Sequence, residues 1–180
     1  QLHELPSPTE AERLSVLAVG GYGREEMAPF SDVDLLFLTP YKITPWAESV
    51  IESMLYILWD LKLHVGYATR SITECLLMGK KDFTIRTTLL ETRRIIGDES
   101  LVSELNNRLW NELFQSSATE FITAKLEERL LRHKKHGENR YLLEPNIKEG
   151  KGGLRDLQSL FWIAKYIHHV QRPEQLIEKN

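Results

Sequence analysis

The sequence predicts an α+β fold, in which a small mixed sheet covered by helices is followed by a helical region. Two short apolar runs, Leu14–Val19 and Asp32–Leu38, have the length of strands and are separated by a polar loop that begins with glycines. Residues 45–61 carry apolar side chains at helical spacing, and helical patterns dominate the second half of the chain. We therefore expect a sheet domain at residues 1–97 and a helical region at residues 98–180.

In the sheet domain the elements are expected in the order strand, turn, strand, helix, strand. Gly21–Met27 is predicted to be a turn with a brief helix, and Thr39-Pro40 stops the second strand because proline cannot donate to a ladder. Pro45–Leu61 fits an amphipathic helix with proline in its first turn. Leu63–Thr69 alternates enough for a third strand, which Gly66 interrupts.

From Ser71 onward the pattern is helical. One helix should begin at Asp98, a second should run from about Ser117 to His136, and a third should cover Leu154–Val170. Pro173 is expected to start a last helical turn. The apolar residues that support the first and third helices are Leu101, Leu105, Leu109, Leu113, Leu157, Leu160, Phe161, Ile163, Ala164 and Ile167.

Composition excludes several classes of protein. The net charge of −3 argues against a general nucleic-acid binder, and no apolar run approaches the ~20 residues of a membrane span. The single cysteine, Cys75, lies in an apolar pattern and excludes a disulfide framework, which indicates a reducing, cytoplasmic setting. Because the chain begins at Gln1 and charged residues continue to its end, we expect a piece of a longer protein.

The first candidate site combines Gly20 and Gly21 with Asp32 and Asp34. Side chains two apart on a strand share a face, so the two carboxylates should lie about 7 Å apart at the start of a buried strand. Mg²⁺ takes one or two carboxylates together with phosphate oxygens, and glycines let backbone N–H groups approach phosphates. This pattern favours nucleotidyl transfer; the alternative is an ordinary turn with acids that solvate a strand start.

A second candidate site lies in the glycine-rich loop before the last long helix. The loop contains Lys148, Lys151, Gly152, Gly153 and Arg155, and residues 125–156 carry a net charge of +3 within a chain of −3. Cations and glycines beside a helix N-terminus suit phosphate or an acidic partner. The alternative is a flexible connection with a solvated charge run.

Four segments resemble a known family. GGYGREEMAPFSDVDLLFL, LWDLKLHVGYATRS, TLLETRRIIGD and RYLLEPNIKEGKGGLRDLQSLFWIAKY are similar to the N-terminal half of the bifunctional PII uridylyltransferase/uridylyl-removing enzymes. The resemblance covers nearly the whole chain and implies a catalytic head with the polymerase-β-type nucleotidyltransferase fold. It implies transfer of UMP from UTP to a tyrosine of the nitrogen-signalling protein PII, with release of pyrophosphate. The family's uridylyl-removing HD domain and glutamine-sensing ACT domains lie farther along its chain.

The resemblance also implies roles for individual residues. Asp32 and Asp34 are expected to ligate Mg²⁺, and the nucleotide is expected to contact the residues Gly20, Gly21, Arg24 and Ser31. The loop residues Lys148, Lys151, Gly152, Gly153 and Arg155 are expected to contact phosphate or the protein substrate. Adenylyl transfer on the same scaffold and a non-catalytic nucleotide- or PII-sensing module are the alternatives.

One departure from the superfamily concerns a third carboxylate on a later strand, which assists the attacking hydroxyl. The predicted third strand has no acidic residue, and Asp82, Glu91 and Asp98 are interpreted as caps or surface acids. His64 is a weak candidate for a general base. The sequence therefore assigns no general base.

Overall fold

The structure, a computed structural model, describes residues 9–137, 146–170 and 175. It contains two compact units, Gln1–Leu113 and Phe114–Asn180. The first unit extends past the expected boundary at residue 97, because the helix α5 (Glu99–Leu109) packs on the sheet. The functional division of the chain into a catalytic and a substrate-binding region stays a prediction.

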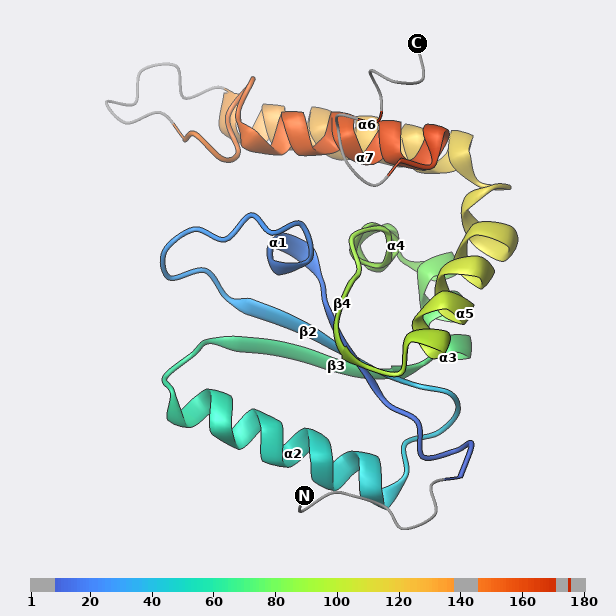
Figure 1. Ribbon diagram of the computed structural model, residues 1–180. Helices are drawn as coiled ribbons and strands as arrows, with labels where there is room; N and C mark the ends of the chain where they lie inside the picture. Colours follow the sequence, from blue (N-terminus) through green and yellow to red (C-terminus); the bar gives the residue numbers. More distant parts are fainter. Residues whose placement is uncertain (1–8, 138–145, 171–174, 176–180) are drawn as a thin grey trace. The chain divides into compact units, whose positions relative to one another are not determined.

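The first unit is built on a four-stranded mixed sheet, which confirms the predicted α+β class (Figure 1). The strand order is β3-β2-β1-β4, with the strands β1 (Ser15–Ala18), β2 (Val33–Thr39), β3 (Val65–Ser71) and β4 (Arg93–Gly97). β1 is antiparallel to β2 and β4, whereas β2 and β3 are parallel. A parallel pair needs a crossover connection, which here contains the helix α2 (Pro45–Asp60).

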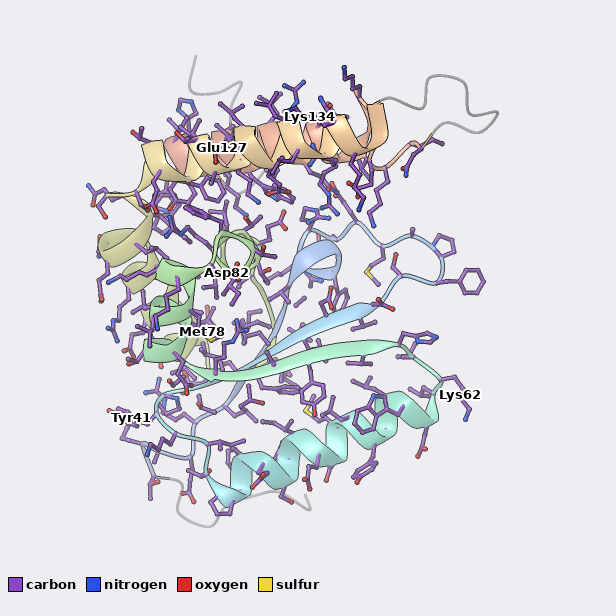
Figure 2. The ribbon with its side chains drawn as sticks, turned by 180° about the vertical axis from the view of Figure 1, so that it is seen from behind. Tyr41, Lys62, Met78, Asp82, Glu127 and Lys134 are labelled. Carbon is purple, nitrogen blue, oxygen red and sulfur yellow. The ribbon has the colours of Figure 1, made fainter. Side chains whose placement is uncertain are left out.

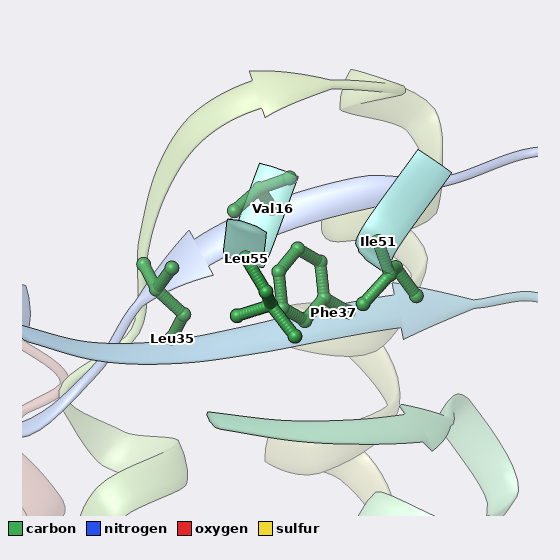
Figure 3. Packing of buried hydrophobic residues seen from close by; sticks show 5 residues of the cluster. All are labelled: Val16, Leu35, Phe37, Ile51 and Leu55. Atoms are coloured by element: carbon green, nitrogen blue, oxygen red, sulfur yellow. The ribbon is translucent and has the colours of Figure 1, made fainter. Parts of the chain in front are cut away.

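α2 covers one face of the sheet. Thr44 caps its N-terminus by accepting a hydrogen bond from the Ala47 N–H, and Pro45 occupies the first turn as predicted. Its buried residues Ile51 and Leu55 lie one turn apart and pack on β1 and β2 (Figure 3). The side chains of this core are Val16, Leu35, Phe37, Ile51 and Leu55.

The helices α3 (Ile72–Lys81) and α5 contact the sheet, and α4 (Phe83–Leu90) packs against α3. Ser71 and Glu74 form a capping box at the start of α3. Asp82, which Figure 2 labels, caps the N-terminus of α4. Cys75 is fully buried in α3, and burial raises the pKa of its thiol to about 12. The prediction that this cysteine belongs to the core is confirmed.

β4 corrects the expectation that everything after Ser71 is helical. Its residues Arg93–Gly97 form an edge strand whose last four residues are exposed, so the sequence lacks the apolar run that marks a buried strand. β3 also differs from its predicted range, because it runs two residues later and Gly66 does not interrupt it.

The second unit pairs α6 (Ala118–Gly137) with α7 (Leu154–His168). The π-helical turn η1 (Trp110–Phe114) ends at the first residue of this unit. The rings of Phe121 and Tyr166 are stacked, with centroids 4.2 Å apart. Leu157, Leu160 and Ile167 are exposed on α7. The predicted helix over Leu154–Val170 is confirmed as α7, although three of the apolar residues that predicted it face away from the helix's buried side. The expected helical turn at Pro173 lies outside the described residues.

No helix among the described residues is long and apolar enough to cross a membrane.

Candidate functional site

Asp32 and Asp34 stand at the start of β2. Asp34 is the second residue of the strand and is half-buried, and Asp32 is exposed immediately before it. Burial raises the pKa of Asp34 above its ordinary value, and the charge of Asp32 raises it further. Because two like charges near a partly buried position oppose ionisation, this pair favours the approach of a cation.

Two glycines enclose the Asp34 carboxylate. A Cβ on Gly20 would lie 3.2 Å from Asp34 Oδ2, and a Cβ on Gly66 would lie 2.6 Å from Asp34 Oδ1. Gly20 also has a φ of 58°, in the left-handed region that glycine enters without strain. Both positions therefore need glycine if the carboxylate is to keep its place.

Asp34 opens into a pocket of about 280 Å³ within the first unit. The sheet supplies its floor, the start of α1 (Gly20–Gly23) supplies one wall, and α4 supplies another. Its lining residues are Val19, Gly20, Asp34, Leu35, Leu36, Gly66, Tyr67, Ala68, Arg70, Ile85, Thr88 and Leu89. The pocket thus joins one carboxylate and one guanidinium through apolar and small side chains.

Of the four residues predicted to contact the nucleotide, Gly20 lines this pocket, whereas Gly21, Arg24 and Ser31 do not. Gly21 follows Gly20 in α1, where the first amide groups of a helix have no partner within that helix. Arg24 instead forms an ion pair with the buried Glu91, with Nη1 2.6 Å from Oε2. Ser31 lies in the exposed loop before β2, where its Oγ accepts a hydrogen bond from the Ala28 N–H.

The other acids that the sequence raised as candidates have structural partners. Asp82 accepts hydrogen bonds from the N–H groups of two residues in the first turn of α4, and Asp98 pairs with Arg13 and caps α5. Glu91 pairs with Arg24. β3 carries no acidic side chain, and among the described residues no group of three or more His, Cys, Asp or Glu side chains could hold a metal ion.

The second candidate site, the loop before α7, belongs to the second unit. Lys148 and Lys151 are exposed, whereas Arg155 bonds to Gln158 and lies 3.7 Å from Glu149. Carbonyls of the loop already accept from the first amide groups of α7: Leu154 donates to Ile147 and Arg155 donates to Lys148. The loop therefore caps its own helix, and its binding role stays a prediction.

The glycines of this loop have structural reasons of their own. Gly152 has a φ of 74°, and its N–H donates to Asp156. A Cβ on Gly153 would lie 2.5 Å from the Ile147 carbonyl oxygen. Both glycines therefore shape the turn that leads into α7.

Sequence reasoning missed a polar cluster around Asp156. The Asp156 carboxylate lies 2.6 Å from Arg132 Nη2 and 2.9 Å from His133 Nε2, so it connects α7 to α6. Burial alone would raise the pKa of Asp156, but hydrogen bonds from the Gly152 N–H, Arg132 and His133 outweigh it and lower the pKa to about 2. This cluster holds the two helices of the unit together.

Sequence reasoning also missed Gly66, Arg70 and Thr88, which line the pocket. The signal that was available is the small, small, cationic alternation of Gly66, Ala68 and Arg70 on one face of β3. This pattern indicates a pocket wall only when β3 is known to lie beside Asp34, and that position follows from the pairing of β2 with β3.

Comparison with known proteins gives related matches over both units. A family model described as GlnD PII-uridylyltransferase matches residues 120–180. Proteins named bifunctional uridylyltransferase/uridylyl-removing enzyme from Cereibacter sphaeroides and Ruegeria pomeroyi are each 64% identical to this chain over 98% of its length. The protein of the same name from Caulobacter vibrioides is 58% identical over 96% of the chain.

The chain spans about a fifth of the length of these curated relatives, since it covers 19% of the first two and 18% of the third. The similarity is continuous across nearly all of the chain, and it confirms the family resemblance that the four sequence motifs predicted.

Proposed function

Because the chain corresponds over 98% of its length to one segment of the bifunctional uridylyltransferase/uridylyl-removing enzymes, we propose that it is a nucleotidyltransferase unit that transfers UMP from UTP to a tyrosine of the protein PII. One observation carries the proposal. The carboxylate of Asp34, with Asp32 beside it, lies between two glycines and lines a pocket of about 280 Å³.

The donor set fits a magnesium ion. Asp32 and Asp34 supply carboxylate oxygens, which Mg²⁺ prefers, and the raised pKa of Asp34 reflects an unfavourable charge that a cation would relieve. When bound, the ion would neutralise charge that develops on the α-phosphoryl group and on pyrophosphate. By holding such an ion at the start of β2, the two carboxylates would help to orient the nucleotide for attack.

The glycine turn complements the carboxylates. Gly20 lies beside the Asp34 carboxylate and Gly21 follows it in α1, so neither residue has a side chain that would keep phosphate oxygens away from the backbone amide groups. The ion pair of Arg24 with Glu91 anchors α1 to the residue that follows α4, and Gly23 fits closely against the Glu91 carbonyl. Arg24 therefore supports the turn, in addition to any contact that it makes with the triphosphate.

Uracil and PII enter the proposal through the names of the relatives and of the family model. The direct test is incubation of the chain with Mg²⁺, PII and UTP labelled on the α-phosphate. Label should appear on PII, should require Mg²⁺ and should be absent when labelled ATP replaces UTP. Label from ATP would favour adenylyl transfer, and Mg²⁺-dependent binding of UTP without transfer would favour a nucleotide-sensing module.

A further inference from the structure

We propose that Arg70 binds the terminal phosphates of the nucleotide, an inference that rests on the proposed nucleotidyl transfer. Arg70 belongs to β3 and lines the same pocket as Asp34. Among the described residues, Asp34 and Arg70 are the charged residues that line this pocket; Asp34 is negative and Arg70 is positive.

The register of β2 and β3 separates Asp34 and Arg70 along the length of the pocket. Asp34 pairs with Gly66 across β2 and β3, and Leu38 pairs with Arg70. Because side chains alternate along a strand, Gly66, Ala68 and Arg70 share a face. Four residues of strand span about 13 Å, and the two small residues leave the pocket open along that length.

The side chain of Arg70 is half-buried in the first unit. Arg70 forms no ion pair or hydrogen bond with another described residue. The acids that feel its field are engaged elsewhere: Glu74 bonds to the N–H and hydroxyl groups of Ser71, and Asp82 caps α4. A half-buried guanidinium without a counter-ion is a site for an anion.

The chemistry of the nucleotide decides which part of it meets Arg70. The ribose and the uracil base are uncharged and give a guanidinium no counter-ion, whereas the terminal phosphates of a triphosphate carry most of its charge. A guanidinium also matches phosphate by donating two parallel hydrogen bonds, which an ammonium cannot do. The Thr88 hydroxyl, which donates to the Thr84 carbonyl, lines the wall nearby and contributes no charge.

The test compares Mg²⁺-dependent binding of UTP, UDP and UMP by calorimetry in the wild-type chain, Arg70→Gln and Arg70→Lys. Arg70→Gln should weaken UTP binding about tenfold or more, because it removes hydrogen bonds to a charged phosphate. The same variant should change the affinity for UMP less than about twofold. Arg70→Lys keeps the positive charge but cannot donate two parallel hydrogen bonds, so its loss of UTP affinity should be intermediate. Arg94→Gln, an exposed arginine of β4 outside the pocket, is the matched control and should bind all three nucleotides like the wild type.

The outcomes separate this inference from the proposed function. If the wild-type chain binds no UTP, the proposed function fails and the inference fails with it. If the wild type binds UTP and Arg70→Gln binds it equally well, or loses UTP and UMP alike, only the inference is overturned. Unchanged UTP affinity with a raised KM for PII would assign Arg70 to the protein substrate and would also overturn it.

Discussion

Gly66 on β3 leaves the space that the carboxylate of Asp34 on β2 occupies. A Cβ at residue 66 would lie 2.6 Å from Asp34 Oδ1, which is closer than a side chain can approach. The two residues are direct partners in the parallel register, so the contact is fixed by the sheet and cannot be relieved by a loop movement.

Gly66→Ala should therefore displace the Asp34 carboxylate. The φ of Gly66 is not in the left-handed region, so alanine fits the backbone and the fold should survive. A misplacement of about 1 Å at a reacting centre can cost about 100-fold in rate, and we expect a loss of that order in transfer to PII. Thr69→Ala on the same strand, outside the pocket lining, should have wild-type activity. A fully active Gly66→Ala chain would show that the Asp34 position is not critical.

Asp34→Asn should keep or raise stability at neutral pH. Burial raises the folded-state pKa of Asp34, so the folded chain holds this proton more tightly than the unfolded chain. The stabilisation by this proton is fully present below the pKa of Asp34 in the unfolded chain and is lost as pH rises through its pKa in the folded chain. At pH 7 the Asp34 carboxylate is therefore charged and destabilises the fold. Thermal unfolding at pH 7 and pH 4 measures this. The advantage of the variant should shrink at pH 4, and a lower melting temperature at pH 7 would contradict the assignment.

Glu91→Ala should destabilise the first unit strongly. Glu91 is nearly fully buried against Arg24, whose side chain is 14% exposed, so the mutation leaves a largely buried cation without this partner. Breaking such a pair costs about 3 kcal/mol or more. Urea unfolding of the two single variants and of the double variant with Arg24→Ala should reveal strong coupling. Glu26→Ala, which removes the exposed partner of Arg24, should cost less than about 1 kcal/mol. Additive effects at Arg24 and Glu91 would exclude the buried pair.

Asp156 should make the chain sensitive to acid. Its folded pKa of about 2 lies below its ordinary value, so its contribution is present above pH 4 and is lost as pH falls toward 2. A shift of this size corresponds to about 2 kcal/mol. Asp156→Asn should lose that amount at pH 7 and little at pH 2, as measured by urea unfolding. Glu127→Gln, at an exposed position of α6 that Figure 2 labels, is the control and should follow the wild type. An equal loss at both pH values would point to packing rather than to charge.

The local part of this structure was readable from the sequence. The spacing of Asp32 and Asp34 before a buried strand, the helix starts at Pro45 and Asp98, and the leucines of α5 each follow a rule that acts within a few residues. These features gave the fold class, most element bounds and the two carboxylates at the start of β2.

The remainder depends on contacts between distant residues. Arg24 meets Glu91 across 67 positions, and Gly66 meets Asp34 only through the parallel register. β4 is an exposed edge strand whose pairing with β1 is decided by the rest of the sheet. On α7 the exposed leucines have the spacing of a buried stripe, and only the packing of Trp162 and Tyr166 reveals which face is inward.

The most direct test of the central claim is the rate of Mg²⁺-dependent transfer from labelled UTP to PII by the wild-type chain, Asp32→Asn and Asp34→Asn. Asp60→Asn, which neutralises an exposed acid at the end of α2, is the matched control. The transfer rate of Asp32→Asn and of Asp34→Asn should each fall about 100-fold or more, because a metal ion at the reacting phosphate contributes several kcal/mol to transition-state stabilisation. The control should match the wild type. Wild-type transfer by either Asp32→Asn or Asp34→Asn, with the fold intact, would contradict the two-carboxylate site.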